Sequence, residues 1–273
     1  MLDYVVSVYC FVDDYVKITH PKKLHERRKQ NDAEIITTAI IAARYFGGNL
    51  LKARHYMYTH HGVKKIHKSN FNRHLHRLND LIISLFIGLG RSLKTLNTDS
   101  EYLIDSFPVA VCKNIRIKRC KLLQGEAYRG YNVSKREYFY GFKVLVITTA
   151  DGIPVEYFIF AGKYHDMTGF KSMDIDLPKG SKLFGDSAFT DYEIEDLYKE
   201  CEDIHLMIER KSNSTRLDSP AQAFIKKYMR KRIETTFGDI TMDFPKRIHA
   251  VTPQGFLLKI LLFLFAYSLN RSV

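Results

Sequence analysis

The sequence predicts an α/β protein in which a mixed five-stranded sheet flanked by helices follows an all-α N-terminal region. Residues 1–96 place apolar side chains at helical spacing. Residues 141–160 contain two β-rich runs on either side of Asp151-Gly152, a pair typical of tight antiparallel hairpin turns. Three shorter apolar runs complete the predicted sheet: 102–104, 182–185 and 204–208.

The chain of 273 residues is long enough for a sizeable core in one large domain or two smaller ones. We place a boundary in the polar segment 91–100, which gives two predicted regions, 1–96 and 97–273. The first region is expected to be helical, and the second is expected to contain the whole sheet.

Two helices open the N-terminal region. The first is predicted to cover 3–18 and to end at His20-Pro21. Asn31 or Asp32 caps the second helix, which closes at Gly47-Gly48. Both ends of the second helix therefore carry ordinary capping residues.

The next two predicted helices resemble a helix-turn-helix joined through Gly62. The third covers 50–58, and the fourth begins at Ser69 with one apolar stripe: Phe71, Leu75, Leu78, Ile82 and Leu85. Its solvent-facing side chains are of types that reach base edges and phosphates: Asn70, Asn72, Arg73, His76 and Arg77. We expect Arg73 and Arg77 to bind DNA; the alternative is a helical bundle with a solvated basic face.

The net charge of +12 and the pI near 9.4 indicate a polyanionic partner, either nucleic acid or an anionic membrane surface. Residues 1–96 hold 16 Lys and Arg against 7 Asp and Glu. The N-terminus lacks the basic start of a signal peptide, and the apolar stretch 256–269 contains Lys259 and is shorter than the roughly 20 residues that span a membrane. The four cysteines form no CxxC pair, so neither a disulfide framework nor a structural zinc is expected.

Asp105 ends a short apolar run and precedes Ser-Phe-Pro, a sequence that does not suit a central strand. We expect this acid to lie where a strand leaves the sheet, and a carboxylate buried there needs a hydrogen bond, a cation or a metal. A basic run follows and is expected to meet a phosphate backbone: Arg116, Lys118 and Arg119. An ordinary solvated loop is the alternative for this run.

Two further acids have comparable settings. Asp186 follows the short strand 182–185, in which Gly185 permits a close backbone approach. Glu234 lies on a helix predicted to start at Ser219-Pro220 and to end at Gly238. The predicted buried stripe of this helix recurs every four residues: Ala221, Ile225, Met229, Ile233 and Phe237. The basic residues nearest Glu234 are expected to contact DNA: Lys227, Arg230 and Lys231.

Asp105, Asp186 and Glu234 can converge on one pocket if the two strands are neighbours. Oxygen-only ligands suit Mg²⁺ or Mn²⁺, and two such ions could activate an attacking oxygen and stabilise a leaving oxygen in phosphodiester chemistry. The alternative is that the two aspartates cap the following elements and that Glu234 pairs with Arg230. The three acids together on a basic chain favour the metal hypothesis.

The segments around these acids resemble the catalytic blocks of DDE transposases from bacterial insertion sequences. They read IDSFPV, FGDSAFTDYE and KRIETTFG, and the insertion sequence 982 group is the nearest in pattern. The resemblance covers about 100–270. Related groups often show Tyr and Arg before the Glu and Lys after it; Arg230 fits, whereas Tyr228 is displaced by one place and position 241 is Thr. This departure leaves a lysine contact with the DNA end unsupported, and Lys246 or Arg247 would only be substitutes.

This resemblance implies an RNase H-like catalytic domain with Asp105, Asp186 and Glu234 as ligands of two Mg²⁺ or Mn²⁺ ions. It also implies a double-stranded DNA substrate, cleavage by water, attack of the freed 3′-hydroxyl on target DNA, and a cytoplasmic, nucleoid-associated oligomer. His165-Asp166 is either an auxiliary polar pair or, by preference, an ordinary loop. Two alternatives are an endonuclease of the same fold without strand transfer and a non-catalytic DNA-binding protein.

Overall fold

The computed structural model describes residues 2–19, 29–132 and 136–272. The chain forms two compact units: residues Met1–Gly88 with Asp243–Val273, and residues Leu89–Met242. The C-terminal helix belongs to the first unit because it packs on an N-terminal helix. These units therefore do not coincide with 1–96 and 97–273, which remain a prediction about functional regions.

The first unit is organised around α2 (Asp32–Phe46). Asn31 caps this helix with a reciprocal capping box to Glu34, and Gly47 ends it with a left-handed φ of 54°, as predicted. Every residue of α2 from 35 to 43 is buried. Its neighbours are α1 (Leu2–Thr19), α3 (Leu50–His60) and α9 (Pro253–Ser272). Helix α1 confirms the predicted first helix over 3–18. Its predicted end at His20-Pro21 lies outside the described residues.

Helix α9 is apolar around its whole circumference. In the described part of the chain it is the one helix long and apolar enough to cross a membrane, and 67% of its most apolar window is buried within the protein. Leu261, Leu264 and Phe265 are at most 2% exposed. The prediction of a buried C-terminal helix is confirmed.

The predicted fourth helix is wrong in one respect, because two helices replace it. They are α4 (Lys68–Arg77), capped by His67 and not by Ser69, and α5 (Asn79–Leu96). An apolar stripe continues across the break at Leu78, so periodicity alone does not reveal the change of direction. Helix α5 also occupies much of the predicted polar junction 91–100, because it continues to Leu96. Within this part of the helix, the buried ammonium of Lys94 pairs with Glu156 at 2.8 Å.

The second unit contains a mixed sheet of six described strands, one more than predicted. The strand order is β2-β3-β1-β5-β6, and β4 also pairs with β3. Antiparallel pairing joins β3 to β1, β2 and β4, whereas β1, β5 and β6 are parallel. The bounds are β1 Glu101–Lys113, β2 Arg129–Asn132, β3 Glu137–Thr149, β4 Pro154–Ala161, β5 Lys182–Gly185 and β6 His205–Ile208. The mixed α/β class is confirmed; the polar strand β2 carries no apolar run that would have predicted it.

The hairpin at Asp151-Gly152 joins β3 to β4, as predicted, and Gly152 takes a left-handed φ of 83°. Strand β1 corrects another prediction, because it continues through Ser-Phe-Pro and pairs with β3 as far as Lys113. Strand β5 pairs with β1 only at Glu101–Leu103, so one edge of β1 lacks a strand neighbour from Asp105 onward in the described sheet. Pro108, which has no N–H to donate, is tolerated on such an edge.

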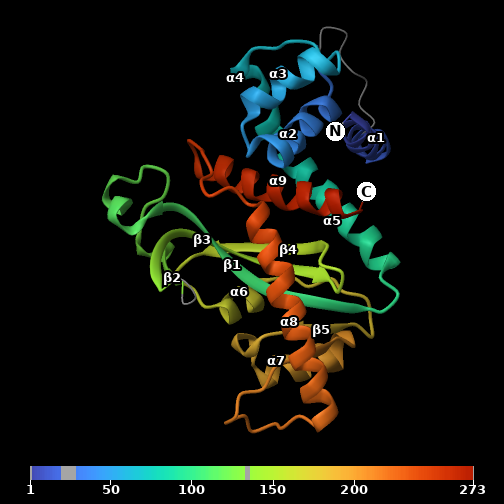
Figure 1. Cartoon of the computed structure of the whole chain (residues 1–273), viewed down its shortest axis with the longest axis vertical. Helices are drawn as coiled ribbons and strands as arrows, with labels where there is room; N and C mark the ends of the chain where they lie inside the picture. The colour runs from blue at the N-terminus through green and yellow to red at the C-terminus, as the bar shows by residue number, and fades with distance from the viewer. Residues whose placement is uncertain (1, 20–28, 133–135, 273) are drawn as a thin grey trace. The chain divides into compact units, whose positions relative to one another are not determined.

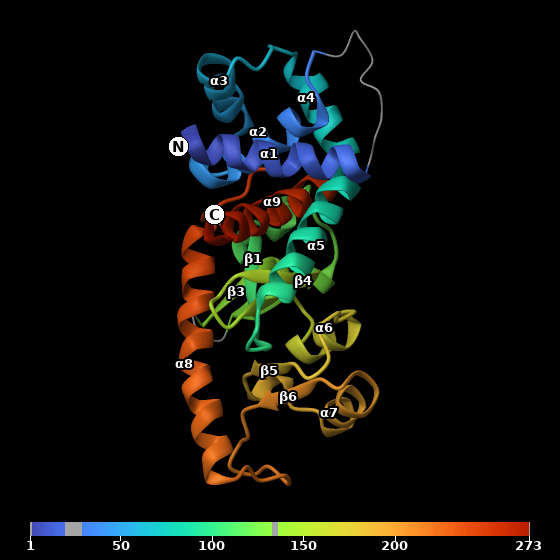
Figure 2. The ribbon, with the colours of Figure 1, turned by 90° about the vertical axis from the view of Figure 1, so that its right-hand side faces the viewer.

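Helices cover both faces of this sheet. Helix α8 (Pro220–Asp243) runs along one face, and α6 (Asp166–Ser172) and α7 (Tyr192–Leu197) lie on the other (Figures 1 and 2). The α6 face is packed with Tyr102 and Ile104 of β1 and Phe170 of α6. The predicted end of α8 at Gly238 is wrong, because the helix continues to Asp243.

The buried stripe of α8 also differs from the prediction. Met229, Ile233 and Phe237 are buried as expected, whereas Ala221 and Ile225 are exposed. Ile240 is completely buried and extends the stripe beyond the glycine. The packing of α8, and not its glycine, therefore decides where the helix ends.

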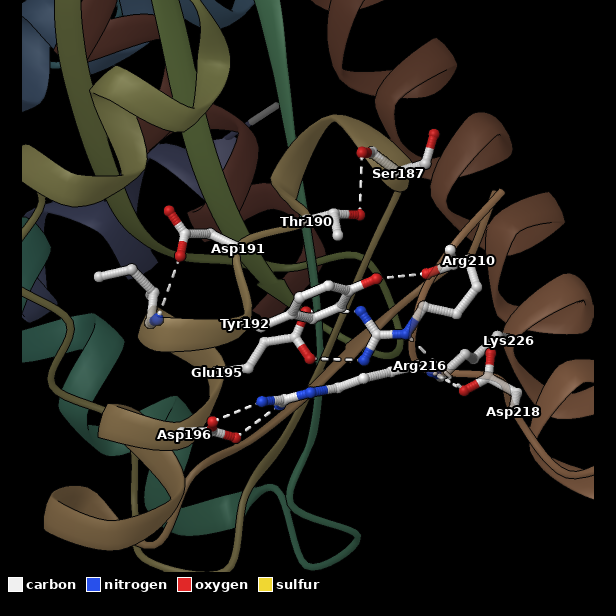
Figure 3. Close-up of polar contacts among 12 residues, drawn as sticks. Ser187, Thr190, Asp191, Tyr192, Glu195, Asp196, Arg210, Arg216, Asp218 and Lys226 are labelled. Carbon is white, nitrogen blue, oxygen red and sulfur yellow. Dashed lines mark hydrogen bonds and ion pairs between the residues drawn. The ribbon is translucent and has the colours of Figure 1, made fainter. Parts of the chain in front are cut away.

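A polar network joins α7 to the segment that leads into α8 (Figure 3). The Arg210 guanidinium donates to both oxygens of Glu195, at 2.6 and 2.5 Å. The Tyr192 ring lies 5.1 Å from Arg210 and 4.7 Å from Arg216, measured from the ring centroid to Cζ. Asp218 accepts from Lys226 of α8 at 2.6 Å. Asp191 caps α7, which continues as the π-helical turn η4 (Tyr198–Glu202).

This network predicts different effects for its two arginines. Arg210→Met should lower the free energy of unfolding by about 1.5–3 kcal/mol, because the Glu195 carboxylate loses its partner in a shielded position. Arg216→Met should have a much smaller effect, since its pair with Asp196 is exposed to solvent. Denaturant unfolding followed by circular dichroism measures both, and equal losses would contradict this assignment.

Candidate active site and nucleic-acid interface

Asp105 lies on β1 beside the point where β5 ends. Tyr102 and Ile104 point into the α6 face, so the alternation of a strand directs Asp105 to the opposite face, along which α8 runs (Figure 2). Its Oδ1 accepts the Ser106 backbone N–H at 2.7 Å. Asp105 was predicted to lie at the end of its own strand. It lies instead within β1, beside the end of the neighbouring strand β5.

Asp186 follows β5 directly and caps the 3₁₀ helix η3 (Ser187–Phe189), where its Oδ1 accepts the Ala188 N–H at 2.8 Å. Gly185 permits the close approach that was predicted. A Cβ at this position would lie 2.9 Å from Ile104 Cγ2 and 3.0 Å from Ile208 Cδ1. The glycine therefore lets the end of β5 lie tightly between β1 and β6.

Glu234 projects from α8 with 67% of its side chain exposed. The Arg230 Nε donates to its Oε1 at 3.2 Å, and the same guanidinium donates to Glu209 Oε2 at 2.7 Å. The alternative contacts weighed from the sequence are thus present: Asp186 caps a helix, and Glu234 pairs with Arg230. These contacts do not isolate Asp105, because the charges of Asp186 and Glu234 still act on it.

Asp105 lies within electrostatic range of Asp186 and Glu234. The pKa of Asp105 is raised to about 7, first by burial and then by the charges of Asp186, Asp166 and Glu234, against the lowering effect of the Ser106 N–H. Burial also raises the pKa of Asp186; the negative charges of Asp166 and Glu209 add to this effect, and Arg230 opposes it. Among the described His, Cys, Asp and Glu residues, no three are close enough to form a ready metal site.

Asp166, at the start of α6, is a fourth carboxylate whose charge acts on Asp105 and Asp186. Its Oδ1 accepts the Ser106 hydroxyl at 2.5 Å and the Lys143 ammonium at 3.1 Å. The preference for an ordinary loop at His165-Asp166 is therefore wrong for Asp166. The sequence alone did not indicate a role for Ser106, Lys143 or Glu209. Only the β1–β3 register, which places Lys143 opposite Pro108, would have indicated Lys143.

The basic residues expected to contact DNA lie on the 3₁₀ helix that follows β1, on α8 and on α4. Arg116, Lys118 and Arg119 are exposed on the 3₁₀ helix η1 (Asn114–Arg119), which follows β1. Another 3₁₀ helix, η2 (Glu126–Tyr128), precedes β2. Lys227, Arg230 and Lys231 are exposed on α8, where Arg230 is engaged by two acids.

In the first unit, Arg73 and Arg77 of α4 line a basic hollow of about 590 Å³. Among the described residues its lining contains no acid and consists of Lys29, Gln30, Lys65, Ile66, His67, Asn70, Arg73, His74 and Arg77. Arg54 supports one wall by donating to the Ile66 carbonyl at 2.5 Å and lying 5.1 Å from the Phe71 ring centroid. The connection 61–67 between α3 and α4 is longer than the three or four residues of a typical helix-turn-helix.

Comparison with known proteins adds independent information. The family model described as "Transposase DDE domain" matches residues 96–244, just over half of the chain, and this range includes Asp105, Asp186 and Glu234. No curated protein matches the chain. No solved structure matches it either. The family match, on a chain with a mixed sheet and an acidic region at the end of β5, leads to one conclusion: this protein belongs to the DDE-domain transposases.

Proposed function

We propose that the protein cleaves phosphodiester bonds at transposon ends and transfers the freed 3′-hydroxyl into target DNA, with Asp105, Asp186 and Glu234 as metal ligands. The observation that carries this proposal is that the charges of Asp186 and Glu234 both act on the buried Asp105 carboxylate. They are separated by 81 and 48 residues in the sequence and come from β1, the end of β5 and α8. Members of the DDE transposase family typically use divalent metal ions.

The side chains fit Mg²⁺ or Mn²⁺ in their chemistry, since these cations prefer carboxylate oxygens. Asp105 carries like charges around it that a cation would neutralise. Glu234 completes the set after its carboxylate leaves Arg230, and its exposed position leaves room for this movement. Two bound divalent cations would lower the pKa of an attacking water or 3′-hydroxyl and stabilise the leaving oxygen.

The protein's own residues then orient the reactants. Asp105 is held by the adjacent N–H of Ser106, and Asp186 is held by the start of η3. Arg230, once released from Glu234, is placed to meet a phosphate of the DNA. This role agrees with the position of the arginine in the transposase motif that the sequence resembles.

The fold superfamily, the transposase group and the oligomeric state are also part of this proposal. Sheet order β4-β3-β1-β5-β6, with β4, β3 and β1 antiparallel and β1, β5 and β6 parallel, supports an RNase H-like domain. The three sequence blocks support a transposase of the insertion sequence 982 group. The enzyme is proposed to act as a homodimer or higher oligomer because paired transposon ends must be cut together.

DNA contacts are proposed for two sets of residues. In the second unit, η1 and α8 present basic side chains to solvent, and these would hold the backbone by charge. In the first unit, the hollow beside α4 collects the basic side chains of Lys29, Lys65, Arg73 and Arg77, and no acid is among its described lining residues. Its size and charge suit phosphate groups of a DNA end.

Two other functions are distinguished by their products. An endonuclease of this fold would cut DNA and form no strand-transfer product from a 3′-hydroxyl donor. A non-catalytic DNA-binding protein would form neither product. The family match and the grouped carboxylates favour the transposase.

Asp105→Asn, Asp186→Asn and Glu234→Gln should each abolish cleavage and strand transfer, because each removes a negative metal ligand while preserving shape. DNA binding measured in EDTA should remain within a few-fold of the wild type. Asp151→Asn is the matched control, because Asp151 lies in the β3–β4 turn and is exposed. Full cleavage by any of the three variants would contradict the assignment of that residue.

The raised pKa of Asp105 predicts an unusual dependence of stability on pH. Without metal, the folded protein binds this proton more tightly than the unfolded chain does, so this group's stabilisation is lost as pH rises from about 4 to 7. Asp105→Asn should therefore unfold at a higher temperature than the wild type at pH 8 in EDTA, because it avoids a cost of about 1.4 kcal/mol for each unit by which the pKa of Asp105 is raised. The difference should shrink as pH falls from 7 toward 4.

Saturating Mg²⁺ at pH 8 should reverse this order, since the wild type gains a ligand that Asp105→Asn lacks. Thermal unfolding followed by circular dichroism measures both conditions. If metal stabilises the two proteins equally, Asp105 is not a metal ligand.

Arg73→Ala and Arg77→Ala should weaken DNA binding and reduce the slope of log affinity against log salt by about 1 each. Fluorescence anisotropy with a labelled duplex at several salt concentrations provides the measurement. Lys52→Ala is the control, because Lys52 is an exposed lysine of α3 outside the hollow. An unchanged slope in both arginine variants would remove the α4 hollow from the interface.

A further inference from the structure

Lys143, Asp166 and Ser106 form a hydrogen-bonded cluster on the sheet face opposite Asp105. Lys143 lies opposite Pro108 in the β1–β3 register, and Ser106 lies two residues earlier on β1, so both side chains emerge on the same face. Asp166 begins α6 on that face and accepts from both, through the same Oδ1. The cluster therefore links β1, β3 and α6.

A continuous path runs from this cluster to Asp105. Lys143 and the Ser106 hydroxyl donate to Asp166, and the Ser106 backbone N–H donates to Asp105 Oδ1. The Lys143 and Asp166 side chains are 16% and 25% exposed, so solvent screens their pair less than a fully exposed one. Ser106 is thus held through its side chain on one face while its N–H holds the Asp105 carboxylate.

The strand needs such support at this position. Pairing of β1 with β5 stops at Leu103, and from Asp105 onward only β3 binds β1 among the described strands. A strand with one free edge has more freedom to twist or shift. A metal ligand on that strand requires a defined orientation, which partners outside the ligand set commonly provide.

We propose that Lys143, Asp166 and Ser106 are positioning residues that fix the 105–106 peptide and so orient the Asp105 carboxylate for a divalent cation. Asp166 acts through Ser106 and is not itself a ligand. This inference rests on the proposed function, because it assigns Asp105 to a metal site.

The test measures Mn²⁺ affinity of the full-length protein by isothermal titration calorimetry without DNA, together with cleavage kinetics. Ser106→Ala and Asp166→Ala break the path and should weaken Mn²⁺ binding about 10–100-fold. Lys143→Met keeps the Asp166 carboxylate but removes the ammonium group that holds it, and should also weaken Mn²⁺ binding. Ser106→Thr keeps the hydroxyl and should restore near-normal affinity.

The expected kinetic change is a lower kcat at subsaturating Mn²⁺, with little change in KM for DNA. Lys171→Met is the matched control, because it removes another lysine–aspartate pair of α6, with Asp191 at 2.6 Å, that has no path to Asp105. Circular dichroism and thermal unfolding establish that each variant is folded.

Wild-type Mn²⁺ affinity in both Ser106→Ala and Asp166→Ala would overturn the inference. It would also be overturned if Asp166→Ala lost binding as completely as Asp105→Asn while Ser106→Ala and Lys143→Met were unaffected, since Asp166 would then be a direct ligand. In either case, loss of binding in Asp105→Asn would leave the proposed function standing. Normal binding in Asp105→Asn would overturn both.

Discussion

The short pairing of β1 with β5 is the constraint on which the candidate site depends. The two strands are joined over three residues of β1, Glu101–Leu103, after which β1 continues for ten residues with β3 as its described strand partner. Because β5 stops, Asp186 leaves the sheet next to Asp105. Had β5 continued, its backbone would occupy the edge of β1 at Asp105.

Concentrating acids at this edge has an electrostatic cost that the surrounding residues partly offset. Asp105 experiences the charges of three other carboxylates, and burial adds to their effect. Lys143 and Arg230 supply opposite charge from β3 and α8. The remaining negative charge favours divalent cations, while the exposed basic residues of η1 and α8 suit a polyanion. In the proposed function, the acids would bind metal ions and the basic residues would bind DNA.

The sequence predicted features that depend on short-range chemistry. Asn31 with Glu34 and Gly47 define α2, because a capping box and a left-handed C-cap involve residues within one turn. Asp151-Gly152 identified the hairpin for the same reason. Errors arose where a distant partner decides the outcome: Pro108 remains in β1 because β5 is absent beside it, and Gly238 remains in α8 because Ile240 is buried further on.

For the candidate site, the sequence by itself determined the three acidic blocks, their order and the basic character of the chain, since these are properties of residue types and spacing. Only the tertiary structure decided that the charge of Asp166 acts on Asp105 and that Ser106 and Lys143 connect the two residues. A strand register, a helix start and the end of a neighbouring strand must coincide for those contacts to form. No local pattern contains that information, because the residues concerned are brought together by backbone pairing and not by their spacing.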